Sequence, residues 1–408
     1  MTIQLLHFAD LHIGVEPYGQ LDPASGINRR VLDYIQRLDE LIDYGLEHQA
    51  DLVLFAGDVY QTASPNPTHQ RAFARCIKRL ADAGIPVVLL LGDHDLPGSA
   101  QKASSVDIFD VLAVPRVIVG KRAGVHRVES RHGPLQVATL PYPTPQRLLA
   151  ADDQRRLPAE EKNQAVEQAI VAQLQALAGQ LDPQLPAVLA AHLLVAGAVP
   201  GSEQTMTASL QATVPLSALT GPGWDYVALG HVHRHQDLNP DGYPPIVYPG
   251  GLERMSFEEE EEAKGFCRVS LARRETTWRF VAVAARPFVT VQADLRAAVD
   301  PVLALRQEID RRGVKEAVVR LVLQLRADQE QHVRDPEVRA LLAEAAFVAS
   351  IRRETAPRDG VRLDNLAPEA LTPHQLLQRY LETQDVAAEY RQELLSHAKE
   401  MLDEPTDN

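Results

Sequence analysis

Cysteine is scarce in this 408-residue chain, which contains only Cys76 and Cys267. The two lie far apart and form no CxxC pair, so we expect neither a disulfide framework nor a thiolate zinc site. No apolar run approaches the roughly 20 residues that a membrane-spanning helix needs, and residues 1–9 lack the regions of a secretory signal. We therefore expect a cytoplasmic protein with no membrane partner.

Basic charge is also in deficit, because 41 Lys and Arg residues face 55 Asp and Glu residues and the net charge is -14. Simple nucleic-acid binders usually carry a basic domain or stripe, so the charge argues against that class. A metal centre or a partner subunit can still supply local positive charge in an acidic protein. The charge therefore weakens the case for DNA as a partner without removing it.

The pattern of apolar residues predicts more than one domain, since the chain exceeds what one hydrophobic core normally organises. Within residues 1–285, short apolar runs alternate with segments of helical period, which is typical of an α/β architecture. The runs are IQLLHFA, DLVLFAG, IPVVLLLG, PAVLAA and DYVALG. The later segments GFCRVSL and TWRFVAV are expected to add antiparallel strands, and the acidic run 258–262 is expected to be a solvated turn.

The pattern changes after residue 285. Residues 286–355 predict a small α+β domain, and the Pro- and Gly-containing residues 356–371 predict a linker. Residues 372–403 predict a pair of short amphipathic helices with too few apolar side chains to form a core of their own. We expect this helical segment to dock on another surface.

Residues that can bind metals follow each of the five apolar runs. They are Asp10 and His12, then Asp58, then Asp93 with His94 and Asp95, then His192, and finally His231 with His233. In open α/β sheets, side chains beyond the carboxyl ends of the strands converge on one site. In extended backbone, positions i and i+2 point to the same side, so the first and last motifs should each act as a pair. Glycines 57, 92 and 230 leave room for close turns where the chain leaves the sheet.

The chemistry of this set points to two metal ions. Carboxylates and imidazoles without thiolates suit manganese, iron or zinc, and seven or eight such ligands are enough for two ions. Two ions about 3.5–4 Å apart can clamp a phosphate and generate hydroxide at neutral pH. A single Asp or His at a strand end is more often a cap or surface group, but the five motifs together favour phosphoester hydrolysis.

The series DLH, GD, GDHD, H and GHVH resembles the signature of the calcineurin-like metallophosphoesterases. The segments DPASGIN and YPGGLER, together with the small domain and helical C-terminus, resemble the SbcD-type nuclease subunits of that superfamily. This resemblance covers nearly the whole chain. It implies a four-layer α/β/β/α sandwich, a DNA-facing capping domain, and C-terminal helices that bind an SbcC-type ATPase. It also implies a homodimer that acts on DNA ends with manganese.

The resemblance also implies a role for each site residue. One metal would be held by Asp10, His12, Asp58 and His233. The other would be held by Asp58, Asp93, His192 and His231, so that Asp58 bridges the two. His94 would face the scissile phosphate as general acid or transition-state stabiliser, with Asp95 orienting its ring. Lys102 and Arg254 are candidates for contacts with DNA phosphates.

Asp93 departs from the signature, which usually has asparagine at this position. The carboxylate adds one negative charge, so we expect tighter metal binding and weaker attraction for phosphate. Two alternatives to a DNA nuclease stay open. A phosphatase or cyclic-nucleotide phosphodiesterase would share the centre but would have little need for residues 287–402. A DNA-end scaffold that no longer turns over would owe its inactivity to Asp93.

Overall fold

The computed structural model describes residues 2–97, 102–149, 157–202, 212–221 and 223–355, and then 377, 378, 381, 390–392, 394, 395, 397 and 398. The chain divides into two compact units. The first holds residues 1–291, 312–320 and 344–350, and the second holds 292–311, 321–343 and the residues from 351 onward. The predicted linker and most of the predicted helical segment 372–403 lie outside the described residues.

The first six-stranded sheet has the order β14-β13-β1-β2-β3-β4. Its parallel strands are β1 (Ile3–Phe8), β2 (Leu52–Phe55), β3 (Val87–Leu90) and β4 (Val117–Gly120). Strands β13 (Gly265–Leu271) and β14 (Thr277–Ala282) extend the sheet beyond β1 in antiparallel pairing, as expected from their sequences. Strands β2 and β3 are buried along their whole length, which explains why their apolar runs are continuous rather than alternating.

The second six-stranded sheet has the order β11-β12-β10-β7-β6-β5. Its parallel strands are β6 (Gly133–Leu140), β7 (Ala187–His192), β10 (Tyr226–Gly230) and β12 (Ile246–Tyr248). The antiparallel strands β5 (Gly124–Ser130) and β11 (Gln236–Asp237) form its two edges. A separate pair, β8 (Leu194–Val195) and β9 (Thr213–Val214), follows β7 in sequence.

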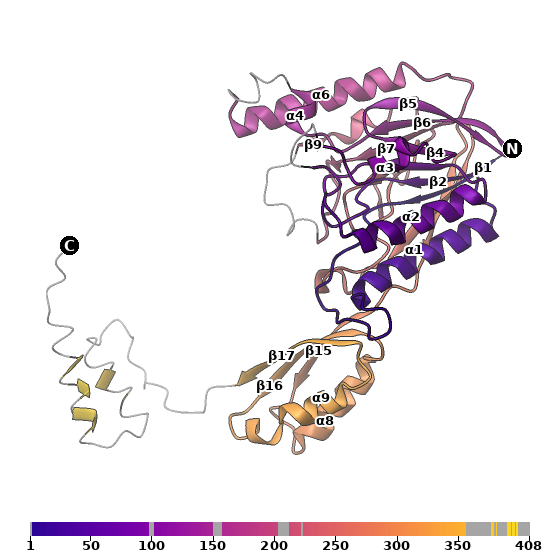
Figure 1. Ribbon diagram of the computed structural model, residues 1–408. Helices are drawn as coiled ribbons and strands as arrows, with labels where there is room; N and C mark the ends of the chain where they lie inside the picture. The colour runs from indigo at the N-terminus through magenta and orange to yellow at the C-terminus, as the bar shows by residue number, and fades with distance from the viewer. Residues whose placement is uncertain are drawn as a thin grey trace. The chain divides into compact units, whose positions relative to one another are not determined.

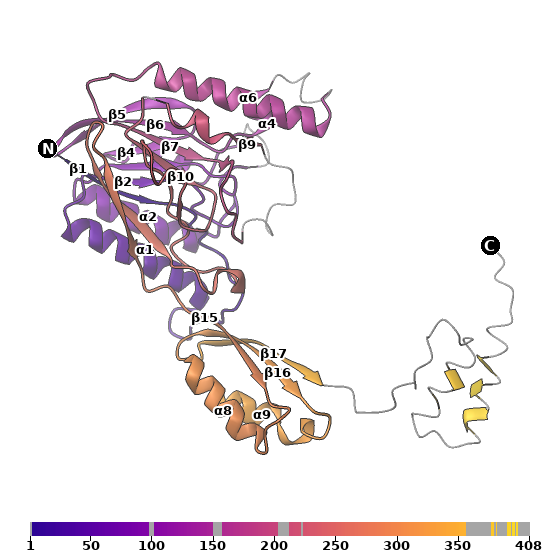
Figure 2. The same cartoon turned by 180° about the vertical axis from the view of Figure 1, so that it is seen from behind.

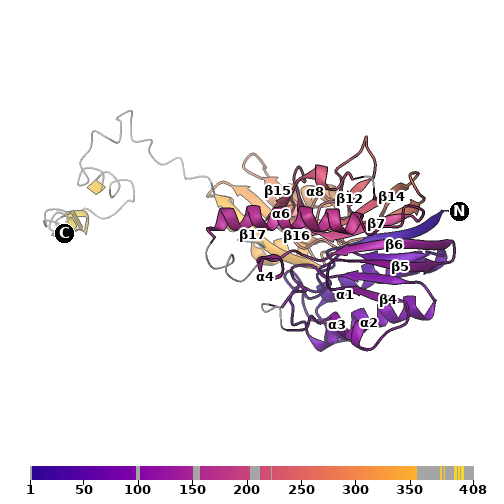
Figure 3. The same cartoon turned by 90° about the horizontal axis from the view of Figure 1, so that it is seen from above.

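Three long helices cover the outer faces of these sheets, as Figures 1 and 3 show. They are α1 (Arg29–Glu47), α2 (Pro67–Asp82) and α6 (Ala159–Ala178). The side chains of Asn28 and Asn66 accept backbone N–H bonds at the starts of α1 and α2, as good N-caps do. The shorter helices α3 (Asp107–Val111) and α4 (Pro145–Leu148), and the 3-10 turns η1 (Leu216–Ala218) and η2 (Phe257–Glu259), lie in connections.

Successive side chains of a strand point to opposite faces of the sheet, and the apolar side chains of the first unit form three clusters. Leu6, Val53 and Leu89 pack with α1 and α2, whereas their sequence neighbours Leu5, Leu54 and Val88 face the other way. That other face meets Val137, Val188 and Ala228 of the second sheet. The opposite face of the second sheet, including Leu189 and Val227, packs with α6. The mixed α/β class predicted from the sequence is confirmed, with two sheets facing each other between helices.

A three-stranded sheet follows, with the order β15-β16-β17. Its strands are β15 (Phe288–Asp294), β16 (Val318–Leu325) and β17 (Phe347–Thr355). The connections hold α8 (Pro301–Arg312), the 3-10 turn η3 (Glu330–His332) and α9 (Asp335–Leu341), and both α-helices lie along one side of the sheet in Figure 2. This stretch therefore contains both helices and strands, while its separation as a domain of residues 286–355 stays a prediction. Among the described residues, no helix is both long and apolar enough to span a membrane.

Candidate metal centre

The predicted ligands lie where strands of both large sheets end. Strand β7 ends at His192, and the other ligands follow β1, β2, β3 and β10 within a few residues. The structure brings their side chains into four overlapping groups, in each of which the candidate ligand atoms lie within 4.8 Å of one another. The groups are Asp10, His12 and His233; His12, Asp58 and His94; Asp93, His192 and His231; and Asp10, Asp58 and His192. The seven predicted ligands therefore converge on one centre.

Asp58 lies between the two sides of this centre. Its Oδ2 atom is 3.5 Å from His12 Nε2 and 3.4 Å from His192 Nε2. On the side of His192, Asp93 Oδ1 lies 3.1 Å from His192 Nε2 and 3.1 Å from His231 Nδ1. The Oδ2 atom of Asp58 thus lies near His12 and His192, which belong to different proposed ligand sets, and this is the position that a bridging ligand requires.

Orphaned polar atoms test whether these residues fit a cation. Within the described part of the chain, Asp10 Oδ2 is buried and has no hydrogen-bond partner, although Asp10 Oδ1 accepts a bond from the His231 amide at 2.9 Å. Leaving a buried carboxylate oxygen unpaired is costly, and a divalent cation would satisfy it. The Nε2 atoms of His12 and His233 also face each other at 3.1 Å in a buried setting. Oxygen and imidazole nitrogen ligands of this kind fit manganese, iron or zinc.

Burial and neighbouring charges favour the protonation states in which His12 and Asp93 can bind a metal. Burial lowers the pKa of His12 far below its ordinary value, and the nearby His233 and His94 add to that effect. Burial raises the pKa of Asp10 to about 6, against the opposing effect of His192 and His233. Burial has the same tendency at Asp93, but hydrogen bonds from His192 and His231 outweigh it and lower the pKa. A neutral imidazole at His12 and an ionised carboxylate at Asp93 are the forms that bind metals.

The backbone of four ligands is in the left-handed region, with φ of 51° at Asp10, 47° at His12, 62° at Asp58 and 103° at His231. The expectation that the Asp10 and His12 pair lies in extended backbone is therefore wrong. Instead, the loops after β1 and β2 hold each other, because the amides of Asp10 and His12 donate to the carbonyls of Gly57 and Asp58 at 3.0 Å. Such conformations cost free energy outside glycine and cluster at functional sites.

Close packing requires glycine at the three predicted positions. A Cβ atom on Gly92 would overlap the carboxylate of Asp58, and one on Gly57 would overlap the ring of His192. A Cβ atom on Gly230 would overlap the carbonyl of Ala56, which accepts a 2.7 Å bond from His192 Nδ1. These glycines let the loops from different strands approach closely enough for the ligands to meet.

His94 lies at the more open side of the centre. Its side chain is 20% exposed, whereas those of His12 and His192 are fully buried. Its amide donates to Asp58 Oδ1, and its Nδ1 lies 2.9 Å from the carbonyl oxygen of Gln61. Burial tends to lower the pKa of His94, but Asp58 and Asp93 outweigh it and raise the pKa.

The expected role of Asp95 is wrong. Its buried carboxylate does not orient the His94 ring, because that ring bonds to Gln61. Asp95 instead accepts the amides of Asp58 at 2.9 Å, Val59 at 3.1 Å and Gly92 at 3.1 Å. It therefore joins the loops after β2 and β3, and Gln61 is a positioning residue that the sequence did not reveal.

The predicted DNA contacts also need revision. The Arg254 guanidinium donates to the backbone carbonyls of Glu259, Glu262, Ala285 and Arg286. These bonds use its donors within the protein, which contradicts a role in binding DNA phosphates. Lys102 is exposed and lines a pocket beside the centre, where its predicted contact stays a prediction.

A buried network behind His233 was missed in the sequence. Glu259, expected in a solvated turn, is buried, and its Oε1 lies 3.5 Å from His233 Nδ1. Lys264 is buried beside it, with Nζ 2.9 Å from Glu259 Oε2, and the Ser202 hydroxyl lies 2.9 Å from His233 Nδ1. Ser202 also donates to Glu259. Because partners of this kind fix the ring and tautomer of a ligating histidine, Glu259 and Ser202 position His233.

Comparison with known proteins gives three useful likenesses. The chain is 26% identical over 304 residues to a protein of Aeropyrum pernix named DNA double-strand break repair protein Mre11. The match covers 72% of this chain and 64% of the Aeropyrum protein, which is less than two thirds of its length. It is 25% identical over 372 residues to the SbcD subunit of the SbcCD nuclease of Escherichia coli K12, covering 88% of this chain and 87% of that one. A crystal structure of a dimetal phosphatase from Danio rerio covers 69% of this chain and 96% of its own, with 13% identity and a TM-score of 0.42.

A family model gives the broadest assignment. The model described as calcineurin-like phosphoesterase matches residues 3–235, which include all seven candidate ligands. That range covers more than half of the chain. The chain belongs to the calcineurin-like phosphoesterase family.

Proposed function

We propose that this chain is a metal-dependent DNA nuclease that hydrolyses phosphodiester bonds at DNA ends or hairpins, as exonuclease and endonuclease. The observation that carries the reaction class is the meeting of four ligand groups around Asp58. Relatives named as a nuclease subunit and as a DNA double-strand break repair protein, each about 25% identical over most of this chain, support the choice of DNA.

Two divalent ions, with manganese the proposed metal, would occupy the centre. Asp10, His12, Asp58 and His233 would hold one ion, and Asp58, Asp93, His192 and His231 would hold the other. Bound ions supply charge that neutralises a phosphate and activates water for attack. The protein's own part is to fix the ligands through the shared loops, to bury them from solvent, and to keep His233 oriented by Glu259 and Ser202.

His94 is the proposed acid of this reaction. The Gln61 carbonyl oxygen lies 2.9 Å from Nδ1, where it can accept the Nδ1 proton and hold the ring in place. The remaining Nε2 is then available to donate to a phosphate or leaving oxygen, on the more exposed side of the centre.

The proposed partners come from the family resemblance. The capping region 286–355 would face DNA, and residues 372–403 would dock on an SbcC-type ATPase. The chain would act as a homodimer in DNA repair. Co-purification of the full chain with a coiled-coil ATPase, compared with a chain ending at residue 371, tests the docking segment.

Two other functions compete with this one. A phosphatase or cyclic-nucleotide phosphodiesterase would use the same centre on small substrates. A DNA-end scaffold would bind DNA without turnover because of Asp93. The test is incubation of linear DNA, hairpin DNA, 4-nitrophenyl phosphate and cyclic nucleotides with manganese. Cleavage of only the small substrates supports the phosphatase, and DNA binding without cleavage supports the scaffold.

The same assay tests His94 with a matched histidine control. His94→Ala should lower the rate of DNA cleavage by about 100-fold or more, the usual contribution of a positioned acid. His48 lies in a distant capping position after α1, where its Nδ1 bonds to the Tyr44 carbonyl, so His48→Ala should retain wild-type rates. Retained cleavage by His94→Ala removes the role proposed for this residue.

A further inference from the structure

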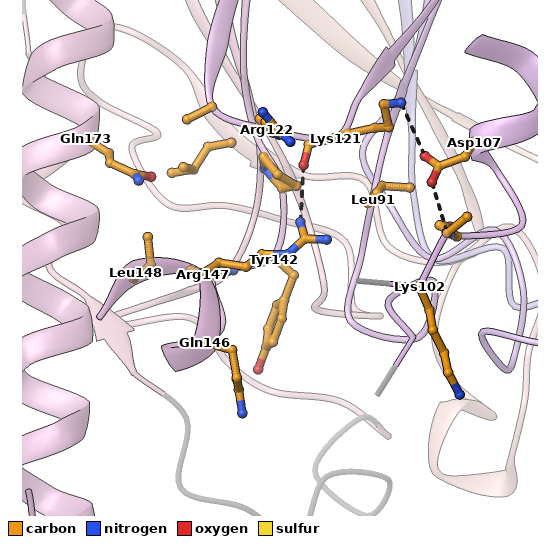
Figure 4. A pocket seen from close by; sticks show the side chains of 16 residues that line it. Leu91, Lys102, Asp107, Lys121, Arg122, Tyr142, Gln146, Arg147, Leu148 and Gln173 are labelled. Carbon is orange, nitrogen blue, oxygen red and sulfur yellow. Dashed lines mark hydrogen bonds and ion pairs between the residues drawn. The ribbon is translucent and has the colours of Figure 1, made fainter. Parts of the chain in front are cut away.

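A pocket of about 690 Å³ lies beside the metal centre, within the first unit. Its walls come from the ends of β3, β4 and β6, and from α4 and α6. The volume falls within the range of about 300–1,000 Å³ typical of small-molecule sites. Figure 4 shows the polar ends of Tyr142, Gln146 and Lys102 pointing to the same side of the pocket.

The lining of this pocket is basic, unlike the chain as a whole. Among the described residues, its lining contains Lys102, Lys121, Arg122 and Arg147 but a single carboxylate, that of Asp107. Lys121 is neutralised within the protein, because its Nζ lies 2.7 Å from an Asp110 oxygen and 3.8 Å from an Asp107 oxygen. Three cationic side chains therefore remain for a ligand in a protein whose net charge is -14.

Arg122 and Arg147 both line the pocket, so their guanidinium groups place two positive charges on its wall. Arg147 donates from one guanidinium nitrogen to the Lys121 carbonyl at 3.1 Å, which fixes its side chain at the pocket wall. Burial lowers the pKa of Arg147, Asp107 opposes this effect, and Arg122 adds to it. Because the arginine nevertheless stays charged at any ordinary pH, this corner of the pocket offers planar donors that suit a phosphate.

Tyr142 joins the pocket to the metal centre. Its ring centroid lies 5.6 Å from that of His231 and 6.1 Å from that of His192, both candidate metal ligands. Its amide donates to the Leu91 carbonyl at 3.0 Å, two residues before Asp93. Tyr142 is therefore a wall of the pocket and at the same time a neighbour of two candidate ligands of the centre.

The ligand chemistry follows from these groups. Aromatic rings in a cationic groove bind single-stranded nucleic acid, because bases stack on the ring and phosphates meet the cations. Gln146 and Gln173 add amide donors and acceptors on the same walls. A lone inorganic phosphate would leave most of the volume unfilled and would make no use of the ring.

We propose that this pocket binds the unpaired nucleotide adjoining the scissile phosphate, with its base or sugar on the Tyr142 ring and its next phosphate between Arg122 and Arg147. This inference deepens the proposed function and rests on it for the identity of the substrate. It predicts that the pocket makes the chain bind an unpaired strand more tightly than a closed duplex.

Direct binding tests the pocket without cleavage. The full chain is titrated into a fluorescein-labelled single-stranded octanucleotide in excess chelator, and anisotropy gives Kd. The double variant R122Q/R147Q should raise Kd at least fivefold, and more for the single strand than for a duplex of the same sequence. Arg127 is an exposed arginine paired with Glu129 on β5, so Arg127→Gln is the matched control and should change Kd less than twofold.

Stacking is tested separately with two substitutions of the tyrosine. Tyr142→Phe keeps the ring and should retain a Kd close to that of the wild type, whereas Tyr142→Leu keeps apolar bulk without a ring and should raise Kd at least fivefold. Circular dichroism and thermal unfolding of both variants establish that they fold. Equal Kd values for the phenylalanine and leucine variants would overturn the stacking role.

Activity gives an independent readout. With manganese, the ratio of kcat/KM for a single-stranded oligonucleotide to kcat/KM for bis(4-nitrophenyl) phosphate should fall at least fivefold in R122Q/R147Q. An unchanged ratio together with an unchanged Kd overturns the inference, as does an equal loss in the Arg127→Gln control. If wild-type protein cleaves no DNA but the Kd differences hold, the nuclease proposal fails and the nucleotide site stands.

Discussion

His12 and His233 direct their Nε2 atoms at each other across 3.1 Å, although 221 residues separate them in the chain. Both rings are buried, and burial lowers the pKa of His12. A hydrogen bond between the two nitrogens needs a proton on one of them, and a cation held by these two residues and their neighbour Asp10 would take the place of that proton. We therefore expect metal binding at this pair to contribute to the stability of the first unit.

Manganese should therefore stabilise the protein against heat. A cation at about 100 times its Kd adds about 2.7 kcal/mol to the free energy of unfolding if it binds only the folded state. We expect addition of manganese after chelation to raise Tm by several degrees, and His12→Ala to lose most of that increase. Differential scanning calorimetry with His48→Ala as control measures it, and an equal increase in the two variants would contradict a metal role for His12.

Asp93→Asn should separate metal binding from catalysis. Asp93 Oδ1 meets both His192 and His231 at 3.1 Å, and removing its charge leaves less negative charge around the ions. We expect manganese affinity to fall roughly tenfold and KM for DNA to decrease, because the centre attracts phosphate more strongly. Isothermal titration measures the manganese affinity, and nuclease rates give the KM for DNA. If neither the affinity nor the KM changes, the hypothesis is wrong.

Gly92→Ala should disturb Asp58 without touching a ligand directly. The added Cβ would overlap the Asp58 carboxylate, so that carboxylate or the loop after β3 must move. We expect a loss of manganese binding together with a lower Tm. Gly179→Ala is the control, because the nearest atom to its added Cβ is the Gln175 carbonyl oxygen, at an ordinary contact distance of 3.5 Å. Full manganese binding by Gly92→Ala would show that the glycine is dispensable.

Glu259→Gln should cost both stability and metal affinity. Burial opposes ionisation of Glu259, but Lys264 and His233 lower its pKa, so the carboxylate is charged in the folded protein. Its removal leaves the buried Lys264 ammonium with Glu262 as its remaining carboxylate partner at 2.9 Å. We expect a loss of about 3 kcal/mol in unfolding free energy and a metal affinity about 10-fold lower. Glu261 is an exposed neighbour and serves as the control. Glu261→Gln should leave the unfolding free energy from chemical denaturation and the metal affinity from titration unchanged.

His7 should make the protein less stable in acid. Burial lowers its pKa from 6.5 to about 3, and its two ring nitrogens lie 3.1 Å from the Tyr226 hydroxyl and from the Leu229 carbonyl oxygen. Since the unfolded state takes up the proton first, stability falls as pH decreases from about 6.5 toward 3, by up to about 1.4 kcal/mol per pH unit. Urea unfolding from pH 7 to pH 4 should show a shallower decline for His7→Gln. Equal losses of unfolding free energy in the wild type and in His7→Gln would show that His7 does not cause the acid sensitivity, since both proteins share every other titrating side chain.

The sequence predicts the strands and the convergence of the candidate ligands well for a physical reason. Strands buried on both faces need continuous apolar runs, and the residues that follow them must converge at one edge of each sheet. The runs before Asp58 and Asp93 show this relationship directly. Glycines 57, 92 and 230 were also predictable, because close approach of loops leaves no room for a side chain.

Contacts between distant segments were not predictable in the same way. The run 258–262 is acidic throughout, and nothing local distinguishes the buried Glu259 from the other four glutamates, since its partners Lys264 and His233 are set by the fold. Arg254 was a candidate for contacts with DNA phosphates, yet its guanidinium donates to four backbone carbonyls that only the fold brings together. The left-handed backbone at Asp10 and His12 likewise follows from pairing with the β2 loop and not from local propensity.

The pairing of β1 with β13 sets an order for biosynthesis. Ile3 lies opposite Leu271, and the ligands of the first strand must wait for His233, 221 residues after His12. At about 5–20 residues per second, that interval on the ribosome lasts between about 10 and 45 seconds. During that time the emerging chain holds an incomplete set of the seven candidate ligands, because His233 is the last of them in the sequence. Loading with metal would therefore be a late event, which would separate molecules with a complete ligand set from nascent ones.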